Sequence, residues 1–310
     1  MARRLIAALI AAIGVLAVAT PAAAGSSDPL PVPYDFLPAA IIGGSNLADG
    51  PPGSNDWTCK PSAAHPNPVV LVHGTLGNGN TNWQTYGPLL HNNGYCVFAL
   101  TYGLIPNAQL PLSLFGGVAP IEGSAVELAA FIARVLHATG ASKVDILGHS
   151  QGTIVPDYYA KFLDGASFID KYISLAPLWH GTNPLGFASL QMLGAPAGAT
   201  TATPTTALTE MSTGSPFITK LRSNGGPKVA GITYTNISTR YDELVQPYTS
   251  GIEPGMTNIV VQDKCPVDFT EHFEIASDPV AAGYVLNALD PAHPRPVPCR
   301  LVLPWIGTTP

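Results

Sequence analysis

Residues 148–152 have the sequence Gly-His-Ser-Gln-Gly, a G-x-S-x-G pentapeptide. A buried strand is predicted directly before it and a helix directly after it. A sharp strand-to-helix turn holds the serine in a strained conformation, and Gly148 and Gly152 are required because side chains there would clash. The motif therefore predicts that Ser150 is a nucleophile, with its hydroxyl at the positive end of the helix.

A serine nucleophile needs a base to accept its proton and an acid to orient that base. For a serine on such a turn, the chain order is serine, then acid, then histidine. His272 lies in a loop between the last predicted strand and the last helix, whereas His293 lies in a Pro-rich tail, so His272 is the predicted base. Asp242, at the carboxyl end of the preceding strand, is the preferred acid; the alternatives are Glu243, Asp263 and Asp268.

The tetrahedral intermediate of acyl transfer needs backbone N–H donors for its oxyanion. One predicted donor is the amide of Gln151, directly after the nucleophile. The other is Thr75, in the loop after the first core strand, where Gly74 lets the chain turn and His73 is expected to support the loop. Phosphate binding is the alternative for this Gly-rich loop, but no Lys-Ser or Lys-Thr pair follows it.

These residues need a framework of strands that alternate with helices. Short runs that favour buried parallel strands occur at 69–72, 96–100, 143–147, 169–175, 228–238 and 257–262. Helices are predicted at 83–92, 122–139, 150–163 and 278–289. The alternation predicts an α/β domain with a mostly parallel central sheet flanked by helices. Pro156 is expected to kink the helix after the pentapeptide or to remove one of its hydrogen bonds.

Two apolar segments interrupt this alternation, at residues 102–121 and 177–206. Neither has a place in the predicted sheet, and both are expected on the same face as Ser150. Apolar insertions of this kind are typical of lids or pocket walls, with ordinary surface loops as the alternative.

The chain divides into three predicted parts. Residues 1–24 read as a secretory signal peptide, with two arginines, an apolar run and three final alanines. Residues 25–66 are predicted to form an extended N-terminal arm, and residues 67–310 the catalytic domain. No later run of 18 apolar residues occurs, so a secreted protein without a transmembrane segment after signal cleavage is expected.

Four cysteines in a chain predicted to be secreted favour two disulfides, for which three pairings exist. We expect Cys59–Cys96 and Cys265–Cys299, because each pair brackets one local segment and closes a modest loop. No C-x2-C spacing favours zinc, and no Asp-x-Asp-x-Asp-Gly loop favours calcium. No bound metal is therefore predicted.

The composition combines 46% hydrophobic residues with only 11% charged residues, compared with about 25% in an average soluble protein. This excludes disorder as the main state. A pI near 5.7 without a basic cluster excludes a nucleic-acid partner. Without the two arginines of the signal, 14 basic residues become 12 against 20 acidic ones. A low-charge surface around the site would suit contact with lipid.

Five segments carry a resemblance to the secreted triacylglycerol lipases of the lipase class 2 family: residues 69–75, 94–100, 148–152, 239–242 and 268–272. The resemblance covers most of the chain between residues 55 and 290. It implies the α/β-hydrolase fold and cleavage of carboxylic esters without a cofactor. It also implies a catalytic triad and an oxyanion hole at the residues already singled out, namely Ser150, Asp242 and His272, with Thr75 and Gln151.

The expected function is therefore hydrolysis of lipid esters through an acyl-enzyme, with transient contact to a lipid surface. An acyltransferase would use the same three residues and differ only in the acceptor, which is an alcohol instead of water. A non-catalytic binding protein on a hydrolase scaffold is the third hypothesis. Such scaffolds usually lose the serine, the histidine or the glycines, and this chain retains all of them.

Overall fold

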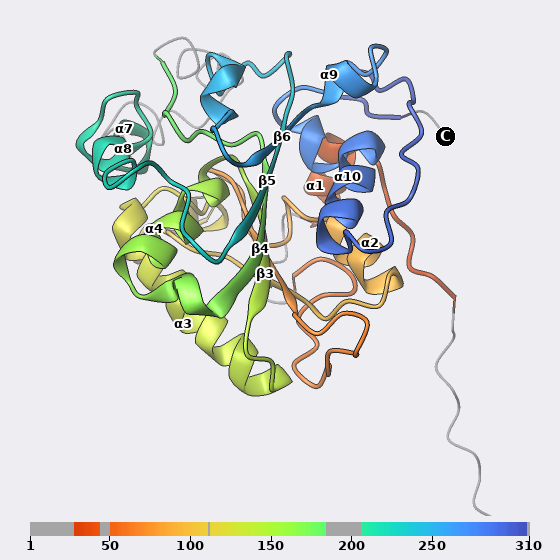
Figure 1. The fold of residues 1–310 in the computed structure, drawn as a ribbon, viewed down its shortest axis with the longest axis horizontal. Coiled ribbons are helices and arrows are strands. Elements are labelled where there is room, and N and C mark those ends of the chain that lie inside the picture. The colour runs from red at the N-terminus through yellow and green to blue at the C-terminus, as the bar shows by residue number, and fades with distance from the viewer. Residues whose placement is uncertain (1–27, 44–49, 111, 184–205, 309–310) are drawn as a thin grey trace, which may run out of the picture.

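The computed structural model describes residues 28–43, 50–110, 112–183 and 206–308. At its centre is a six-stranded sheet in the order β2-β1-β3-β4-β5-β6, in which every neighbouring pair is parallel (Figure 1). The strands are β1 (Val69–Val72), β2 (Val97–Leu100), β3 (Val144–His149), β4 (Ile169–Leu175), β5 (Thr233–Ser238) and β6 (Thr257–Val260). The predicted mostly parallel sheet is confirmed.

Helices cover both faces of this sheet (Figure 1). One face carries α3 (Ile121–Thr139), α4 (Val155–Phe162), α7 (Thr206–Glu210) and α8 (Pro216–Leu221). The other face carries α1 (Phe36–Gly43), α2 (Tyr86–Asn92) and α10 (Pro279–Leu289). A short helix, α9 (Val261–Lys264), directly follows β6.

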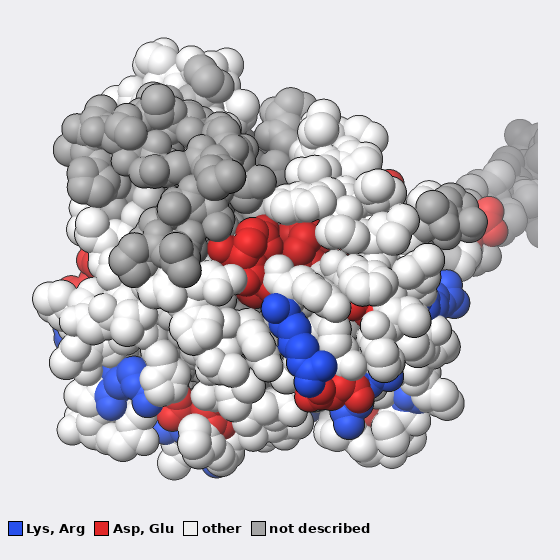
Figure 2. All heavy atoms as spheres, turned by 90° about the horizontal axis from the view of Figure 1, so that it is seen from above, with Lys and Arg blue, Asp and Glu red and all other residues white. Residues whose placement is uncertain are grey.

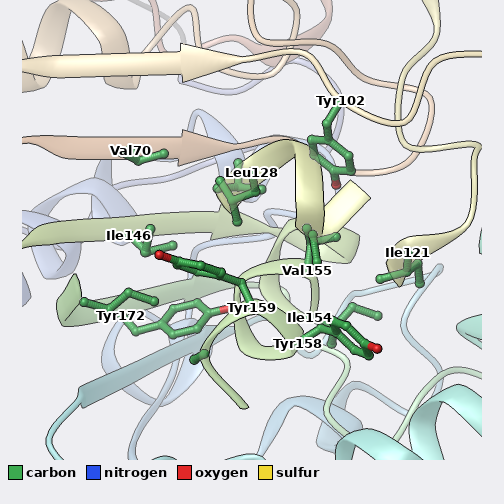
Figure 3. Close-up of a cluster of buried hydrophobic side chains, with 14 of the residues drawn as sticks. Val70, Tyr102, Ile121, Leu128, Ile146, Ile154, Val155, Tyr158, Tyr159 and Tyr172 are labelled. Carbon is green, nitrogen blue, oxygen red and sulfur yellow. The ribbon is translucent and has the colours of Figure 1, made fainter. Parts of the chain in front are cut away.

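The two faces of the sheet bury two separate hydrophobic cores. Val70 and Val72 of β1 belong to the core under α3 and α4, which Figure 3 shows in part. Val69 and Leu71 belong to the core under α2 and α10. Because successive side chains of a strand point to opposite faces, a strand covered on both sides is apolar throughout. This explains the uninterrupted apolar run of β1.

The segment after β3 differs from the predicted single helix at 150–163. A short 3-10 helix, η2 (Ser150–Thr153), comes first, and α4 begins only at Val155. Pro156 therefore lies in the first turn of α4, where the missing N–H would have no partner inside the helix. The prediction of a kink is wrong, because this proline lies at the start of the helix and not in its interior.

The predicted strand at 228–238 is shorter in the structure, where β5 begins at Thr233. Gly231 has a φ of +86°, which is incompatible with extended strand backbone. The chain thus turns before it enters the sheet.

The sequence predicts an extended N-terminal arm, but the arm contains helix α1 and is therefore not extended throughout. Pro38 lies in the first turn of this helix, a position that tolerates proline. The backbone N–H of Phe36 donates to Oε2 of Glu274 at 3.0 Å, which fastens the start of α1 to the domain. The predicted signal peptide lies outside the described residues.

Both expected disulfides are present. Cys59–Cys96 joins the arm to the start of β2, and Cys265–Cys299 joins the end of α9 to the C-terminal tail. Their Cα–Cα distances of 5.8 and 5.0 Å lie in the normal range for disulfides. Of the helices in the described ranges, none has the length and apolar character needed to cross a bilayer.

Candidate active site

Ser150 lies at the turn between β3 and η2, at the carboxyl edge of the sheet. Its φ of +54° is in the left-handed region, which is strained for a residue with a side chain. A Cβ on Gly148 would lie 2.1 Å from the carbonyl oxygen of Gly152, and one on Gly152 would lie 1.9 Å from that of Val72. Only glycine therefore fits at these two positions without a shift of the backbone.

His272 and Asp242 meet near this turn. Nδ1 of His272 lies 2.9 and 3.0 Å from the two carboxylate oxygens of Asp242. Oδ1 of Asp242 also accepts the backbone N–H groups of Leu244 and Val245, at 3.0 and 2.7 Å, which fixes the carboxylate. When Nδ1 keeps its proton and donates a hydrogen bond to the carboxylate, the neutral ring has Nε2 free to accept a proton.

Three carboxylates determine the proton affinity of His272, which is almost completely buried. Burial by itself lowers the pKa of an imidazole, but the charges of Asp242, Glu243 and Glu271 outweigh it and raise the pKa of His272 above 6.5. Oε2 of Glu243 also accepts the backbone N–H of His272 at 3.2 Å. Asp242 and Glu243 therefore hold the ring and the backbone of the same residue.

A cavity of about 240 Å³ contains Ser150, His272 and Thr75 in its wall. No Asp, Glu, Lys or Arg from the described residues lines it. Oγ of Ser150 has no hydrogen-bond partner in the described part of the chain, although Ser150 and His272 border the same space. Hydrogen bonds between catalytic groups are often long without substrate and shorten in the complex. The apolar walls come from Phe36, Ala40, Leu76, Leu178, Leu208, Met211, Leu244, Val245 and Phe273.

The loop that carries Thr75 is held on both sides of this residue. The N–H of Gly74 donates to Oδ1 of Asn82 at 3.1 Å. The N–H of Leu76 donates to the carbonyl oxygen of Gly116 at 2.9 Å. The backbone position of Thr75, which lines the cavity, is therefore fixed by its neighbours.

The side chain of Gln151 is buried behind the turn. Its Nε2 donates to the carbonyl oxygen of Gly117 at 2.9 Å, and its Oε1 accepts from the hydroxyl of Tyr102 at 3.0 Å. The segment at 102–121 thus supports the loops around Ser150 from behind. None of its described residues lines the cavity, so the interpretation of this segment as a pocket wall is wrong.

The second apolar segment, 177–206, contributes Leu178 and Thr182 to the cavity wall. Its residues 184–205 lie outside the described residues.

The surface seen from above consists mainly of uncharged residues, with Asp and Glu side chains gathered near its centre (Figure 2).

The alternative acids and the alternative base lie outside the cavity wall. His293 is exposed and bonds to Asp290. Asp263 is exposed and forms an ion pair with Arg240. Asp268 is buried, and its Oδ1 accepts the N–H of Thr270 at 2.9 Å.

Two residues that the sequence did not identify also border the cavity, His149 and Asn82. His149 is the variable residue before the nucleophile, and the G-x-S-x-G pattern assigns it no role. Asn82 lies seven residues after Thr75 in a polar stretch without a recognisable motif. Within the described ranges, no group of three or more His, Cys, Asp and Glu side chains is arranged to hold a metal ion.

Two solved structures with a similar architecture are lipases. Aspergillus fumigatus lipase B superposes with a TM-score of 0.59 at 23% identity, over 84% of this chain and 68% of that one. Bacillus licheniformis lipase BlEst2 in its mature form gives a TM-score of 0.55 at 18% identity, over 76% and 96%. At these identities the likeness concerns the fold, which is the α/β-hydrolase fold.

Two curated relatives share a shorter stretch with the chain. Triacylglycerol lipases of Pseudarthrobacter phenanthrenivorans and Burkholderia plantarii are 34% and 32% identical over 103 residues. The matched stretch is 32% of this chain and covers 29% and 26% of these relatives, less than a third of their length. The family model for lipase (class 2) matches residues 66–285, more than two thirds of the chain, and includes Ser150, Asp242 and His272. The chain belongs to the lipase (class 2) family.

Proposed function

We propose that this protein is a secreted ester hydrolase that cleaves neutral acyl esters, triacylglycerols among them, through an acyl-enzyme on Ser150. Nε2 of His272 takes the hydroxyl proton while Oγ of Ser150 attacks the carbonyl carbon of the ester. Asp242 stabilises the imidazolium that forms. The backbone N–H groups of Thr75 and Gln151 bind the oxyanion of the tetrahedral intermediate.

Collapse of this intermediate breaks the bond to the alcohol oxygen, and the imidazolium of His272 donates its proton to the departing alkoxide. Water then attacks the acyl-enzyme while His272 accepts its proton. The second tetrahedral intermediate releases the carboxylic acid and returns the proton to Oγ of Ser150. The balance is one ester and one water converted to one alcohol and one acid, without a cofactor.

The observation that carries this proposal is the geometry at one cavity. A strained serine and a histidine bonded to a buried carboxylate border one cavity, and none of the described residues that line it is Asp, Glu, Lys or Arg. An ionic substrate would lose its hydration there without a partner, whereas an acyl chain would bury apolar surface. The partial matches to triacylglycerol lipases support a glycerolipid ester as substrate. The two disulfides support an extracellular location.

Helix α1 supports contact with a lipid surface. Its sequence has no charged residue, and Phe36 and Ala40 line the cavity. Ile41 and Ile42 are 78% and 80% exposed. Insertion of these two side chains into lipid would place the cavity next to the substrate. We expect Ile41→Ser with Ile42→Ser to lower activity on a triacylglycerol emulsion and to leave hydrolysis of soluble p-nitrophenyl butyrate unchanged.

The decisive experiment measures hydrolysis of p-nitrophenyl esters of increasing chain length by the wild type and by Ser150→Ala. We expect the substitution to reduce kcat by at least about 10⁴-fold. A fluorophosphonate should label the wild type and leave Ser150→Ala unlabelled. Full activity of Ser150→Ala, or absence of labelling in the wild type, would refute the acyl-enzyme on Ser150.

A further inference from the structure

His149 spans two loops of the site. It is buried and directly precedes Ser150. Its Nε2 lies 2.8 Å from the backbone carbonyl oxygen of His272, and its Nδ1 lies 3.1 Å from Oδ1 of Asn82. The same Oδ1 accepts the N–H of Gly74 at 3.1 Å. One ring and one carboxamide therefore connect the His272 loop to the loop that carries Thr75.

The hydrogens on this bridge follow from its partners. A carbonyl oxygen only accepts, so Nε2 of His149 carries a proton. Burial lowers the pKa of His149 to about 3, so the ring is neutral at physiological pH and Nδ1 has a lone pair. This lone pair needs a donor. Nδ2 of Asn82 is such a donor, and it is buried without a partner among the described residues.

Asn82 thus has two neighbours with different requirements. Its oxygen satisfies the N–H of Gly74, whereas its NH₂ group is what Nδ1 of His149 requires. A rotation of the carboxamide that satisfies the ring would remove the acceptor from Gly74. The side chain is therefore shared between the two loops, and a change in one loop alters the hydrogen bonding of the other.

We propose that Asn82 and His149 are positioning residues that set the distance between the oxyanion loop and the loop of His272. Neither residue exchanges a proton with the substrate. This inference rests on the proposed function, because it assigns the two residues to the same acyl-transfer reaction. Loss of the bridge would displace the Thr75 amide relative to Ser150 and His272, which weakens stabilisation of the tetrahedral intermediate more than binding of the ester.

A double-mutant cycle tests the bridge. Asn82→Leu and His149→Phe each remove its polar atoms at similar volume. With p-nitrophenyl butyrate we expect each to lower kcat by about 10- to 100-fold, the effect of a misplacement on the order of 1 Å, and to change KM little. The kcat of the double variant should be about equal to that of the slower single variant, because either substitution alone already breaks the same bridge. Multiplicative losses would show two independent roles and overturn the proposal.

A boronic acid measures the oxyanion geometry separately, because it forms a tetrahedral adduct with the serine. Its Ki should rise in each variant in step with the fall in kcat/KM. An unchanged Ki would contradict a role in positioning. Asn82→Asp keeps an acceptor for Gly74 and should recover part of the kcat lost in Asn82→Leu. His137→Phe, on the exposed side of α3, is the matched control for replacing a histidine by phenylalanine.

Folding and function are separated by two further measurements. Near-UV circular dichroism identifies a variant that does not fold, and His149→Gln then replaces His149→Phe in the cycle. If Ser150→Ala remains active, the proposed function fails. If Ser150→Ala is inactive while Asn82→Leu and His149→Phe equal the His137→Phe control, only the bridge fails.

Discussion

His272 and His73 occupy two regions at the same edge of the sheet that are almost equally buried but differ in electrostatics. Burial lowers the pKa of His73 to about 4. Its Nδ1 donates to the carbonyl oxygen of Gly74, and its Nε2 accepts the N–H of Tyr102, so a neutral ring satisfies both partners. Around His272, by contrast, carboxylates outweigh burial and raise the pKa.

Burial therefore does not by itself distinguish a structural histidine from one that transfers protons. Both nitrogens of His73 have backbone partners, and its ring stacks on Tyr102 at 4.2 Å. His272 has a carboxylate on one nitrogen and a cavity near the other. A ring that is buried, held on one side and open to a cavity on the other has the environment that general-base catalysis requires.

The largest effect is expected at His272 itself. Replacing it by alanine removes the proposed base, so kcat should fall on the order of 10⁴- to 10⁶-fold. His73→Phe should stay within about tenfold of the wild type, because it removes only support for the loop. Single-turnover measurements with p-nitrophenyl butyrate give both values. Similar losses in the two variants would contradict the different roles assigned to these two histidines.

The next largest effect is expected at Asp242. Asp242→Asn keeps the size of the side chain but removes the charge that stabilises the imidazolium and selects the tautomer. We expect kcat to fall on the order of 10³- to 10⁴-fold. Asp263→Asn, at an exposed ion pair, is the control and should retain activity. Loss of activity in Asp263→Asn together with an active Asp242→Asn would reassign the acid.

A smaller effect concerns the stability of the His73 region. Below pH 6.5 the unfolded chain protonates this histidine, but the folded protein does so only near pH 4. The wild type therefore loses up to about 1.4 kcal/mol of stability per pH unit from this group between pH 6.5 and 4, whereas His73→Phe does not.

Urea unfolding at several pH values measures this effect. His137→Phe is the control, because it also removes one imidazole from the unfolded chain but replaces a histidine that is exposed in the folded protein. The stability difference between wild type and His73→Phe should shrink as the pH falls. A difference that stays constant between pH 6.5 and 4 would show that His73 is not held neutral.

The smallest effect is expected at Glu243, whose charge contributes to the raised pKa of His272. Glu243→Gln keeps an acceptor for the backbone N–H of His272 but removes the charge. The pKa of His272 should fall, so the acid limb of kcat/KM against pH should move to lower pH by roughly half a unit. Glu122→Gln, at the exposed ion pair with Lys220, is the control. A shift to higher pH would show that Glu243 does not act through its charge.

Local patterns in the sequence were sufficient for the elements that carry the nucleophile. The apolar runs of β1 and β3 reflect strands covered on both faces, and Gly148 is required by a contact inside its own turn, with the carbonyl oxygen of Gly152. Such features depend on neighbours in the chain, so a single sequence contains them. The two disulfides were predictable because each closes a local segment.

Features that depend on distant segments were not predictable in the same way. Helix α1 was missed because its apolar residues lie in a Pro-rich stretch, and its partners, such as Glu274, are more than 200 residues away. The segment at 102–121 has an apolar sequence that fits a pocket wall equally well, and only tertiary contacts place it behind the loops.

The order serine, acid, histidine along the chain and the strands that these residues follow could be derived from the sequence alone. Both depend on local properties, namely the order of the residues and the hydrophobic pattern of each strand. The sequence did not determine the protonation of the histidines. His73, His149 and His272 are all buried, and what separates them is whether a carbonyl, a carboxamide or a carboxylate faces the ring. Only the tertiary structure decides this, because the electrostatic effect of a group depends on its distance in space and not on its position in the chain.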